Sequence, residues 1–302
     1  MKKFALSFTA LVLALTLSAT LTASAFADNA APVAENLELK TYQNVSVGGS
    51  LSAYDAEGEA LTYTVTTEPV KGTIEVKEDG SFVYTPKENK KGRDYFGYKA
   101  TDAQGAVSQE ATVIIKIEKA KKDVLYSDMR GTAEEYAAVA LCERGIFTGE
   151  QLCGEYCFNP DKAVTRGEFL SMCMCLAGDD MVSAVLTTGY SDDGAIPAWM
   201  KGYVATAAMR GVVQSGAYSA PFEPNAPITE AEGAMMLDKA VKLTSVSYAE
   251  LDNTLSPEAA QACANLTACG VTDGSVSTSY LTRSAAAKML IGALEVLDKR
   301  AK

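Results

Sequence analysis

The chain has 302 residues, with 27 basic and 38 acidic side chains, a formal net charge of −11 and no histidine. Residues 123–302 hold most of the excess negative charge, with 23 acidic and 13 basic side chains. This balance argues against nucleic acid as a partner, because phosphate contacts need a basic face. The lack of histidine excludes imidazole acid–base chemistry and histidine metal sites, and no other motif indicates an enzyme.

The N-terminal residues 1–27 are predicted to be a secretory signal peptide. Two lysines precede an apolar run from Phe4 to Leu21, and Ala25–Ala27 offers small residues for cleavage. Serines and threonines interrupt the run, which argues against a retained membrane anchor. No later segment reaches the roughly 18 consecutive apolar residues that a spanning helix needs. The mature protein is therefore expected to begin near Asp28, to be secreted and to have no membrane span.

Residues 28–118 are predicted to form an all-β sandwich of about seven strands. Apolar residues alternate with polar ones in short runs separated by turn residues, as half-buried antiparallel strands require. These runs are Leu61–Val65, Ile74–Val76, Phe82–Tyr84, Phe96–Ala100 and Val113–Ile117. Asp79 and Gly80 lie between two of the runs and predict a tight hairpin.

Four motifs in this span occur in an order that resembles bacterial cadherin-like or Ig-like extracellular domains. They are Asp55–Gly58, Gly80–Pro86, Gly92–Tyr98 and Thr101–Gly105. The resemblance implies that acidic loop residues bind calcium, and the candidates are Asp55, Glu57, Asp94 and Asp102. The alternative is that Asp and Gly simply form turns. Cadherin calcium also sits between tandem copies, and this chain has one copy. No other cofactor or metal is expected.

Residues 119–123 are lysine-rich and predict a solvated linker. Such a linker is expected to let the sandwich move relative to the rest of the chain.

The second half of the chain contains three repeats, at residues 124–178, 188–243 and 248–298. Repeats 1 and 2 share a Tyr-Ser-Asp opening, a helical stretch, a glycine turn, an aromatic-x-Pro loop and a Thr-x-x-Glu helix start. Repeat 3 lacks the aromatic-x-Pro loop and the final Glu. The helices before the glycine turns are expected at residues 133–144, 198–210 and 257–269. The apolar stripe of Trp199, Tyr203 and Ala207 predicts that the copies pack on one another.

This pattern resembles S-layer homology domains. The resemblance implies a mostly helical, pseudo-threefold domain whose three copies share one core. It also implies that grooves between the repeats bind an anionic secondary cell-wall polysaccharide, which is the expected partner.

The Thr-x-x-Glu motifs predict helix-capping boxes at Thr165 and at Thr229. Capping does not explain Arg166 or Arg283, because a cation one residue after the cap opposes the helix dipole. An anion held there by free backbone amides and the guanidinium would reverse this penalty. We therefore predict Arg166 and Arg283 as ligand residues, with Thr165 beside the first. Glu230 has the equivalent place in repeat 2 and predicts a weak groove.

Three aromatic residues, Tyr126, Tyr190 and Trp199, are candidates for stacking on sugar rings. The alternative for the two tyrosines is a place in the core.

The seven cysteines all lie in the repeats. Most are predicted to be small apolar core residues. Cys153 and Cys157 share one loop and are the candidates for a disulfide, whereas Cys263 and Cys269 lie too far apart along one helix.

These features predict a secreted surface protein that its repeats attach noncovalently to the cell wall, with the sandwich displayed outward. One alternative is a structural subunit that assembles into a surface layer. Another is a secreted carbohydrate-binding adhesin.

Overall fold

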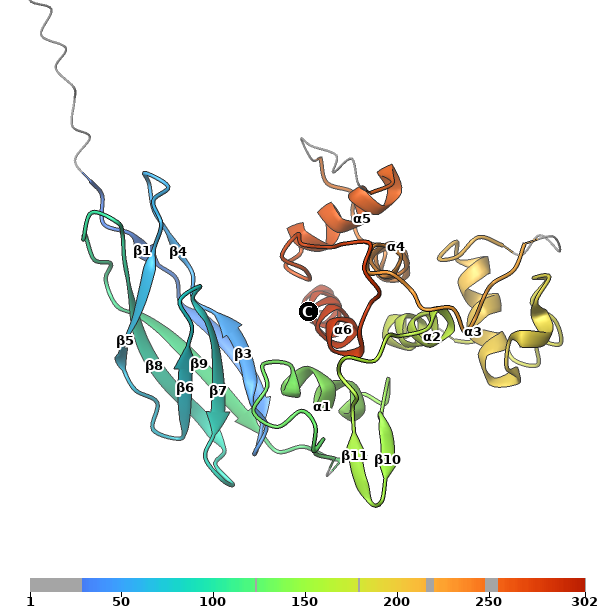
Figure 1. Ribbon diagram of the computed structural model, residues 1–302, viewed down its shortest axis with the longest axis horizontal. Helices are drawn as coiled ribbons and strands as arrows, with labels where there is room; N and C mark the ends of the chain where they lie inside the picture. Colours follow the sequence, from blue (N-terminus) through green and yellow to red (C-terminus); the bar gives the residue numbers. More distant parts are fainter. Residues whose placement is uncertain (1–28, 123, 179, 216–219, 248–254, 302) are drawn as a thin grey trace, which may run out of the picture.

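The computed structural model describes residues 29–122, 124–178, 180–215, 220–247 and 255–301. The predicted signal peptide lies outside this part of the chain. Figure 1 shows strands β1 to β9 gathered on the left and the helices on the right. The expected order, an all-β domain followed by a mostly helical one, is confirmed.

The β-sandwich consists of two main sheets and a two-stranded ribbon. The four-stranded sheet has the order β2 (Leu37–Tyr42), β9 (Ala111–Glu118), β8 (Gly92–Thr101) and β5 (Thr62–Thr67). The three-stranded sheet has the order β3 (Val47–Ser50), β7 (Ser81–Pro86) and β6 (Gly72–Val76). The ribbon pairs β1 (Val33–Ala34) with β4 (Ala53–Tyr54).

The sandwich core follows the predicted alternation. Every second residue of β9 is buried, and Phe82 packs edge-on against Phe96 with ring centroids 5.3 Å apart. Gly80 supplies a positive φ of 80° to the predicted hairpin. One pairing differs from the all-antiparallel expectation, because β2 lies parallel to β9. The two strands are far apart in the sequence, so no local signal sets their direction.

The helical half contains six α-helices, one short hairpin and a 3₁₀ turn at Asp193–Ala195 within the described residues. The helices are α1 (Glu135–Glu143), α2 (Arg166–Ala177), α3 (Ala198–Met209), α4 (Glu230–Val241), α5 (Pro257–Ala268) and α6 (Arg283–Arg300). The hairpin joins β10 (Glu150–Leu152) to β11 (Glu155–Cys157). Helices α2, α4 and α6, one from each predicted repeat, contact one another. A single hydrophobic core extends through all three repeats.

Three buried residues join the repeats at their common centre. Val164 donates its N–H to the carbonyl of Leu281 (2.9 Å), Leu281 donates to Ile228 (2.8 Å), and Ile228 donates to Val164 (3.0 Å). Each residue comes just before the cap of α2, α4 or α6, and each is at most 1% exposed. We call these three residues the axial ring. The ring closes the repeats into a pseudo-threefold arrangement.

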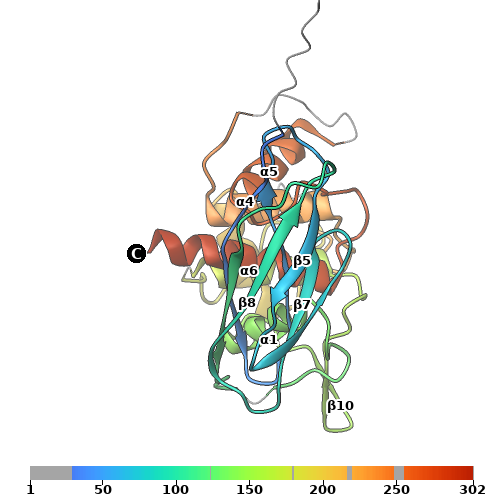
Figure 2. The ribbon, with the colours of Figure 1, turned by 90° about the vertical axis from the view of Figure 1, so that its left-hand side faces the viewer.

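The sandwich contacts the helical half directly. The N–H of Gly48 on β3 donates to the carbonyl of Ala133 (2.9 Å), and the N–H of Tyr136 donates to the carbonyl of Ser46 (3.1 Å). The N–H of Ser46 also donates to Oε2 of Glu135, which is buried (3.0 Å). Val45 of the sandwich belongs to the helical core. Figure 2 shows the sheets standing directly in front of the helices.

The linker is also held in place. The N–H groups of Lys121 and Lys122 donate to the carboxylate of Glu143 (2.8 and 2.6 Å), and Nζ of Lys122 donates to the carbonyl of Cys142 (2.6 Å). The linker lysines are exposed, as expected, whereas the bonds at Lys121 and Lys122 contradict the expectation that the linker lets the sandwich move. Asp123 lies outside the described residues.

The cysteines only partly follow their prediction. Cys142, Cys173 and Cys263 are buried, whereas the other four are at least partly exposed, so fewer than half lie in the core. Cys153 and Cys157 are not joined by a disulfide, and Cys153 occupies the hairpin turn with a φ of 51°. Among the helices that the structure describes, none is long and apolar enough to cross a membrane.

Candidate functional site

The predicted capping boxes begin α2 and α4. Oγ1 of Thr165 accepts from the N–H of Glu168 (3.3 Å), and the Glu168 carboxylate accepts from the N–H of Thr165 (3.0 Å). Thr229 and Glu232 repeat this arrangement. Thr282 caps α6 with its hydroxyl alone. Thr165 is therefore a helix cap, with its hydroxyl oxygen occupied as an acceptor.

The first two N–H groups of each of these helices donate to the loop of another repeat. The acceptors are all backbone carbonyl oxygens. The donor and acceptor residues are Arg166 and Ala226 (2.8 Å), Gly167 and Pro224 (2.9 Å), Glu230 and Ser279 (2.9 Å), Ala231 and Ser277 (3.1 Å), Arg283 and Lys162 (2.9 Å), and Ser284 and Pro160 (3.0 Å). The third N–H is bound by the cap. The expectation that free helix amides face an anion is therefore wrong, and an anion at these positions must be held by side chains.

These bonds define three junctions between the repeats. In the first junction, α2 of repeat 1 meets the loop of repeat 2. In the second, α4 of repeat 2 meets the loop of repeat 3. In the third, α6 of repeat 3 meets the loop of repeat 1.

The first junction contains a partly open arginine. The side chain of Arg166 is 31% exposed, and its guanidinium lies over the ring of Phe222, 5.6 Å from the centroid. Its nearest described carboxylate oxygen is Oε1 of Glu232, at 3.7 Å, which is too long for a hydrogen bond. Arg166 can therefore still donate hydrogen bonds to a ligand.

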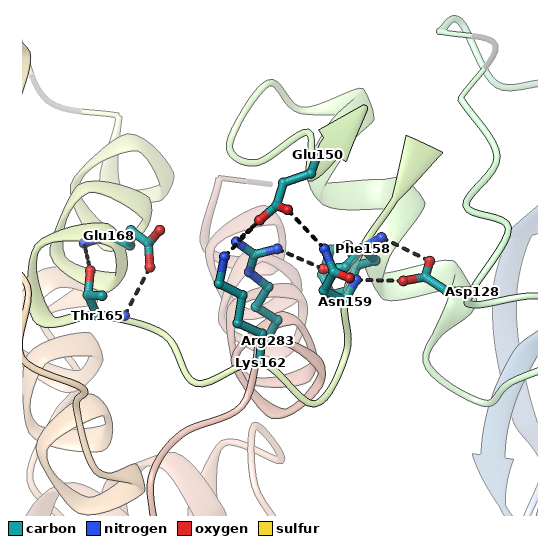
Figure 3. A network of polar contacts seen from close by, with 8 residues as sticks. All are labelled: Asp128, Glu150, Phe158, Asn159, Lys162, Thr165, Glu168 and Arg283. Atoms are coloured by element: carbon teal, nitrogen blue, oxygen red, sulfur yellow. Dashed lines mark hydrogen bonds and ion pairs between the residues drawn. The ribbon is translucent and has the colours of Figure 1, made fainter. Parts of the chain in front are cut away.

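The third junction contains a buried arginine. The side chain of Arg283 is 5% exposed and lies over the ring of Phe147, 5.0 Å from the centroid. Its Nη1 donates to the carbonyl of Phe158 (3.0 Å), and its Nη2 donates to Oε1 of Glu150 (2.8 Å). Figure 3 shows these contacts. Arg283 therefore connects repeat 3 to repeat 1, and its guanidinium is bound by groups of the chain itself rather than open to a ligand as expected.

In the second junction the helix begins with an acidic residue, Glu230, where the other two helices begin with arginine. The carboxylate of Glu230 accepts hydrogen bonds from the N–H of Ser277 (3.0 Å) and from its hydroxyl (2.8 Å). Glu230 thus stabilises the loop of repeat 3, a role that its sequence position alone does not reveal.

The aromatic candidates divide into two groups. Tyr126 and Tyr190 are 0% and 7% exposed, and their hydroxyls donate to the carbonyls of Thr148 and Gln214. Burial also raises the pKa of both tyrosines. Their rings present no face to a sugar, so the core alternative is correct. Trp199 is 60% exposed and remains available for stacking.

Asp128 and Asp192 are structural residues that the prediction of site residues did not include. Each carboxylate accepts two backbone N–H groups of its aromatic-x-Pro loop. The donors are Phe158 (2.9 Å) and Asn159 (2.6 Å) for Asp128, and Phe222 (2.7 Å) and Glu223 (2.8 Å) for Asp192. The Tyr-Ser-Asp motif that opens repeats 1 and 2 is the sequence signal that could have identified these two residues. These bonds hold the loops whose carbonyls receive the helix N–H groups.

Two of the four calcium candidates do not suit a metal ion. The buried carboxylate of Asp94 already accepts from the N–H groups of Val70 and Lys71 and from the hydroxyl of Tyr84. Glu57 is exposed. Neither residue has an oxygen that lacks a donor and is also buried.

Oxygens that do lack donors gather near Asp55 and Asp102. Among the described residues, Oδ1 of Asn29, Oδ2 of Asp55 and Oε2 of Glu59 are buried without a hydrogen-bond partner. Asn29 donates to Asp102 (2.9 Å), and the N–H of Glu59 donates to Asp55 (2.8 Å). No three His, Cys, Asp or Glu side chains that the structure describes could hold a metal ion together. This group instead combines two carboxylates with an amide oxygen, a set that suits calcium.

A cleft of about 940 Å³ lies between the sandwich and helices α1 and α6. Its lining includes four acidic and four lysine side chains: Glu38, Lys40, Lys77, Glu134, Lys288, Glu295, Asp298 and Lys299. With this balance of charge, the cleft does not favour an anionic polymer.

Two parts of the chain match known protein families. Residues 29–119 match the bacterial cadherin-like domain, and residues 189–234 match the S-layer homology domain. The second match falls within repeat 2. No curated protein matches the chain.

Similar solved structures cover about a third of the chain. An endo-fucoidan hydrolase of glycoside hydrolase family 107 shares 22% identity over 31% of this chain and 14% of its own, with a TM-score of 0.25. The SrpA adhesin of Streptococcus sanguinis shares 17% identity over 33% of this chain and 67% of its own (TM-score 0.25). Drosophila N-cadherin shares 15% identity over 32% and 27% (TM-score 0.26). These scores are too low to carry an argument about fold or activity.

Proposed function

Because the chain carries a bacterial cadherin-like domain followed by an S-layer homology domain, we propose that its helical half binds an acidic secondary polysaccharide of the bacterial cell wall. The sandwich is the module that this attachment displays. The S-layer homology domain indicates association with the cell surface. Both matched families are non-catalytic, and we propose no enzymatic activity. Residues 124–178 and 248–298 act as two further copies of the same repeat.

Arg166 is the observation on which this proposal rests. Its guanidinium is partly exposed, is backed by the ring of Phe222, and has no carboxylate within hydrogen-bond distance among the described residues. Residues 215–221, which precede that ring, contain no acidic side chain. A planar guanidinium can bind a carboxylate through two parallel hydrogen bonds. Trp199 on α3 adds an exposed aromatic surface in repeat 2, the repeat that also contains Phe222.

The polymer must also tolerate nearby acids. Glu232 lies 3.7 Å from Arg166, and Glu223 is an exposed residue of the same loop. Binding is therefore expected to be selective for a compact acidic group that reaches Arg166, and to weaken as salt is raised.

The test is sedimentation of the full mature chain with purified sacculi of the producing bacterium. Arg166→Gln is expected to weaken binding by about 1.5–3 kcal/mol, roughly 10- to 150-fold, the range for hydrogen bonds to charged groups. Arg144→Gln is the matched control, because it removes the same charge from a side chain that is 49% exposed and bound to Asp298. Equal binding by both variants would exclude Arg166 as the ligand residue.

Sacculi stripped of their secondary polymers distinguish the ligand. Loss of binding after stripping supports the polysaccharide, whereas unchanged binding points to peptidoglycan. Ordered lattices of purified protein in electron microscopy would instead favour a surface-layer subunit. Binding to soluble glycans but not to sacculi would favour an adhesin.

We also propose that Asn29, Asp55 and Glu59 bind calcium at one pole of the sandwich. Asp55 is 8% exposed, and burying a carboxylate oxygen without a donor is unfavourable unless a cation pairs with it. Oxygen ligands of this kind suit calcium. Of the four residues that the sequence suggests, this site keeps Asp55 and adds Asn29 and Glu59.

Calorimetric titration with calcium chloride tests this site. The mature chain is expected to bind calcium more tightly than magnesium and to melt at a higher temperature with it. Asp55→Asn should abolish both effects, and the exposed Glu57→Gln should retain them. Calcium binding that survives Asp55→Asn would place the ion elsewhere.

A further inference from the structure

Glu150 on β10 is surrounded by three donors from other parts of the fold. Its Oε1 accepts from Nη2 of Arg283 (2.8 Å) and Nζ of Lys162 (2.8 Å), and its Oε2 accepts from Nδ2 of Asn159 (3.2 Å). Figure 3 shows the carboxylate pointing into this group. The ammonium of Lys162 and the guanidinium of Arg283 hold the pKa of Glu150 below its ordinary value. The carboxylate is therefore bound as a charged group.

The fold holds the guanidinium of Arg283, the buried donor of this group, in a fixed position. Arg283 begins α6, and its guanidinium is held in place by the carbonyl of Phe158 and the ring of Phe147. Its Nη2 is thereby directed at Oε1 of Glu150. The side chain of Glu150 is itself 39% exposed, so the site lies at the surface of the domain.

The first junction shares the arginine of this site but not its other donors. Arg166 begins α2 as Arg283 begins α6, but its guanidinium lies over Phe222, which corresponds to Phe158 and not to Phe147. In repeat 2, Glu223 and Ala226 replace Asn159 and Lys162, and residues 215–221, which follow the glycine turn as Glu150 does in repeat 1, contain no acid. The acid beside the arginine and the two extra donors that bind it are therefore features of the third junction.

We propose that the third junction is a carboxylate-binding site that the chain fills with its own Glu150. The side chain acts as an internal ligand and keeps acidic sugars out of this junction. It is present at a high effective concentration, because its strand is attached to the same repeat as Lys162 and Asn159. The exclusion of sugars rests on the proposed wall binding, whereas the carboxylate site itself does not.

Removal of the internal ligand tests the site with a simple probe. Glu150→Ala should lower the melting temperature of the mature chain, and sodium acetate should restore it. Acetate at ten times its dissociation constant is expected to raise Tm by about 3–6 °C, whereas sodium chloride of equal ionic strength should not. The wild type should show no difference between the two salts.

The double variant Glu150→Ala/Arg283→Gln is the control, because it lacks the proposed receptor. Equal stabilisation of Glu150→Ala by acetate and chloride, or equal acetate rescue of the double variant, would overturn the proposal. Should Glu150→Ala unfold in both salts, Glu150→Ser keeps a short polar side chain that leaves the site open. Heat of acetate binding to Glu150→Ser beyond that of the wild type would support the site, and its absence would refute it.

A second measurement addresses the exclusion of sugars. Short acidic oligosaccharides released from sacculi should bind the wild type with a stoichiometry of one and Glu150→Ala with a stoichiometry of two. A stoichiometry of two for the wild type would overturn the exclusion alone. No binding to either chain would overturn wall binding and the exclusion, and the acetate result would still decide the carboxylate site.

Discussion

Glu135→Ala is predicted to loosen the sandwich from the helical half. Oε2 of Glu135 accepts from the N–H of Ser46 in the sandwich and from the N–H of Gly131, both at 3.0 Å. Ser46 is 2% exposed, so water cannot easily replace the lost acceptor. The variant therefore leaves a buried donor without a partner at the contact between the domains.

The loss of stability at the contact can be compared with the contribution of the backbone hydrogen bonds that remain across it. An unsatisfied buried N–H costs about 1–3 kcal/mol, and each remaining backbone bond across the contact contributes about 0.5–1.5 kcal/mol. Two such bonds remain, Gly48 to Ala133 and Tyr136 to Ser46. The loss is thus comparable to the contribution of both together, and the separated population should rise roughly 5- to 150-fold. Val45 still packs in the helical core.

Limited proteolysis of the linker measures this population, because the N–H groups of Lys121 and Lys122 are bonded to Glu143 of α1 in the joined state. Glu135→Gln is the matched variant. Both hydrogen bonds end on one oxygen, so a single amide oxygen can accept them, and cleavage should stay close to the wild-type rate. If Glu135→Ala were cleaved no faster than wild type, Glu135 would not hold the domains together.

The same residue predicts a pH dependence. Burial raises the pKa of Glu135 above its ordinary value of 4.5. The joined state therefore binds more protons than the separated state between 4.5 and the raised pKa. Joining should become more favourable as the pH falls through this window, and Glu135→Gln should lose the effect. Faster linker cleavage of wild type on acidification within that window would contradict the assigned sign.

Three further variants test the repeats. Thr165→Ala should lower the free energy of unfolding by about 1 kcal/mol through loss of the cap, and an unchanged denaturation midpoint would contradict this. Ile228→Ala should lower it by about 2–5 kcal/mol, because the side chain is buried at the centre, and urea unfolding measures the loss. Trp199→Ala should weaken binding to sacculi while changing Tm little, and a large fall in Tm would show that the exposed ring is structural.

Local signals were sufficient for the helices and their caps. Thr165 and Glu168 are three residues apart, so the sequence alone contains the whole capping box. Arg166 and Arg283 each directly follow a capping threonine, yet one side chain is 31% exposed and the other 5%. The difference comes from Glu150, which lies 133 residues before Arg283. No spacing rule connects these two positions.

The remaining errors have the same physical origin. The amides at the helix starts were expected to be free because their acceptors, such as Pro160 and Pro224, belong to other repeats. The linker was expected to be mobile because its lysines suggest solvation, whereas Glu143 binds their backbone N–H groups. In each case a partner distant in sequence satisfies a group that looks unsatisfied locally.

The axial ring also makes the stability of each repeat depend on the other two. In an open array of repeats each copy contacts only its neighbours, so copies can be added, removed or folded one at a time. Here Val164 of the first repeat is hydrogen-bonded to Leu281 of the last. A chain that ends after two repeats would leave the N–H of Val164 and the carbonyl of Ile228 without partners. Each of these unpaired groups would cost about 1–3 kcal/mol, so the loss of a single copy lowers the stability of the copies that remain.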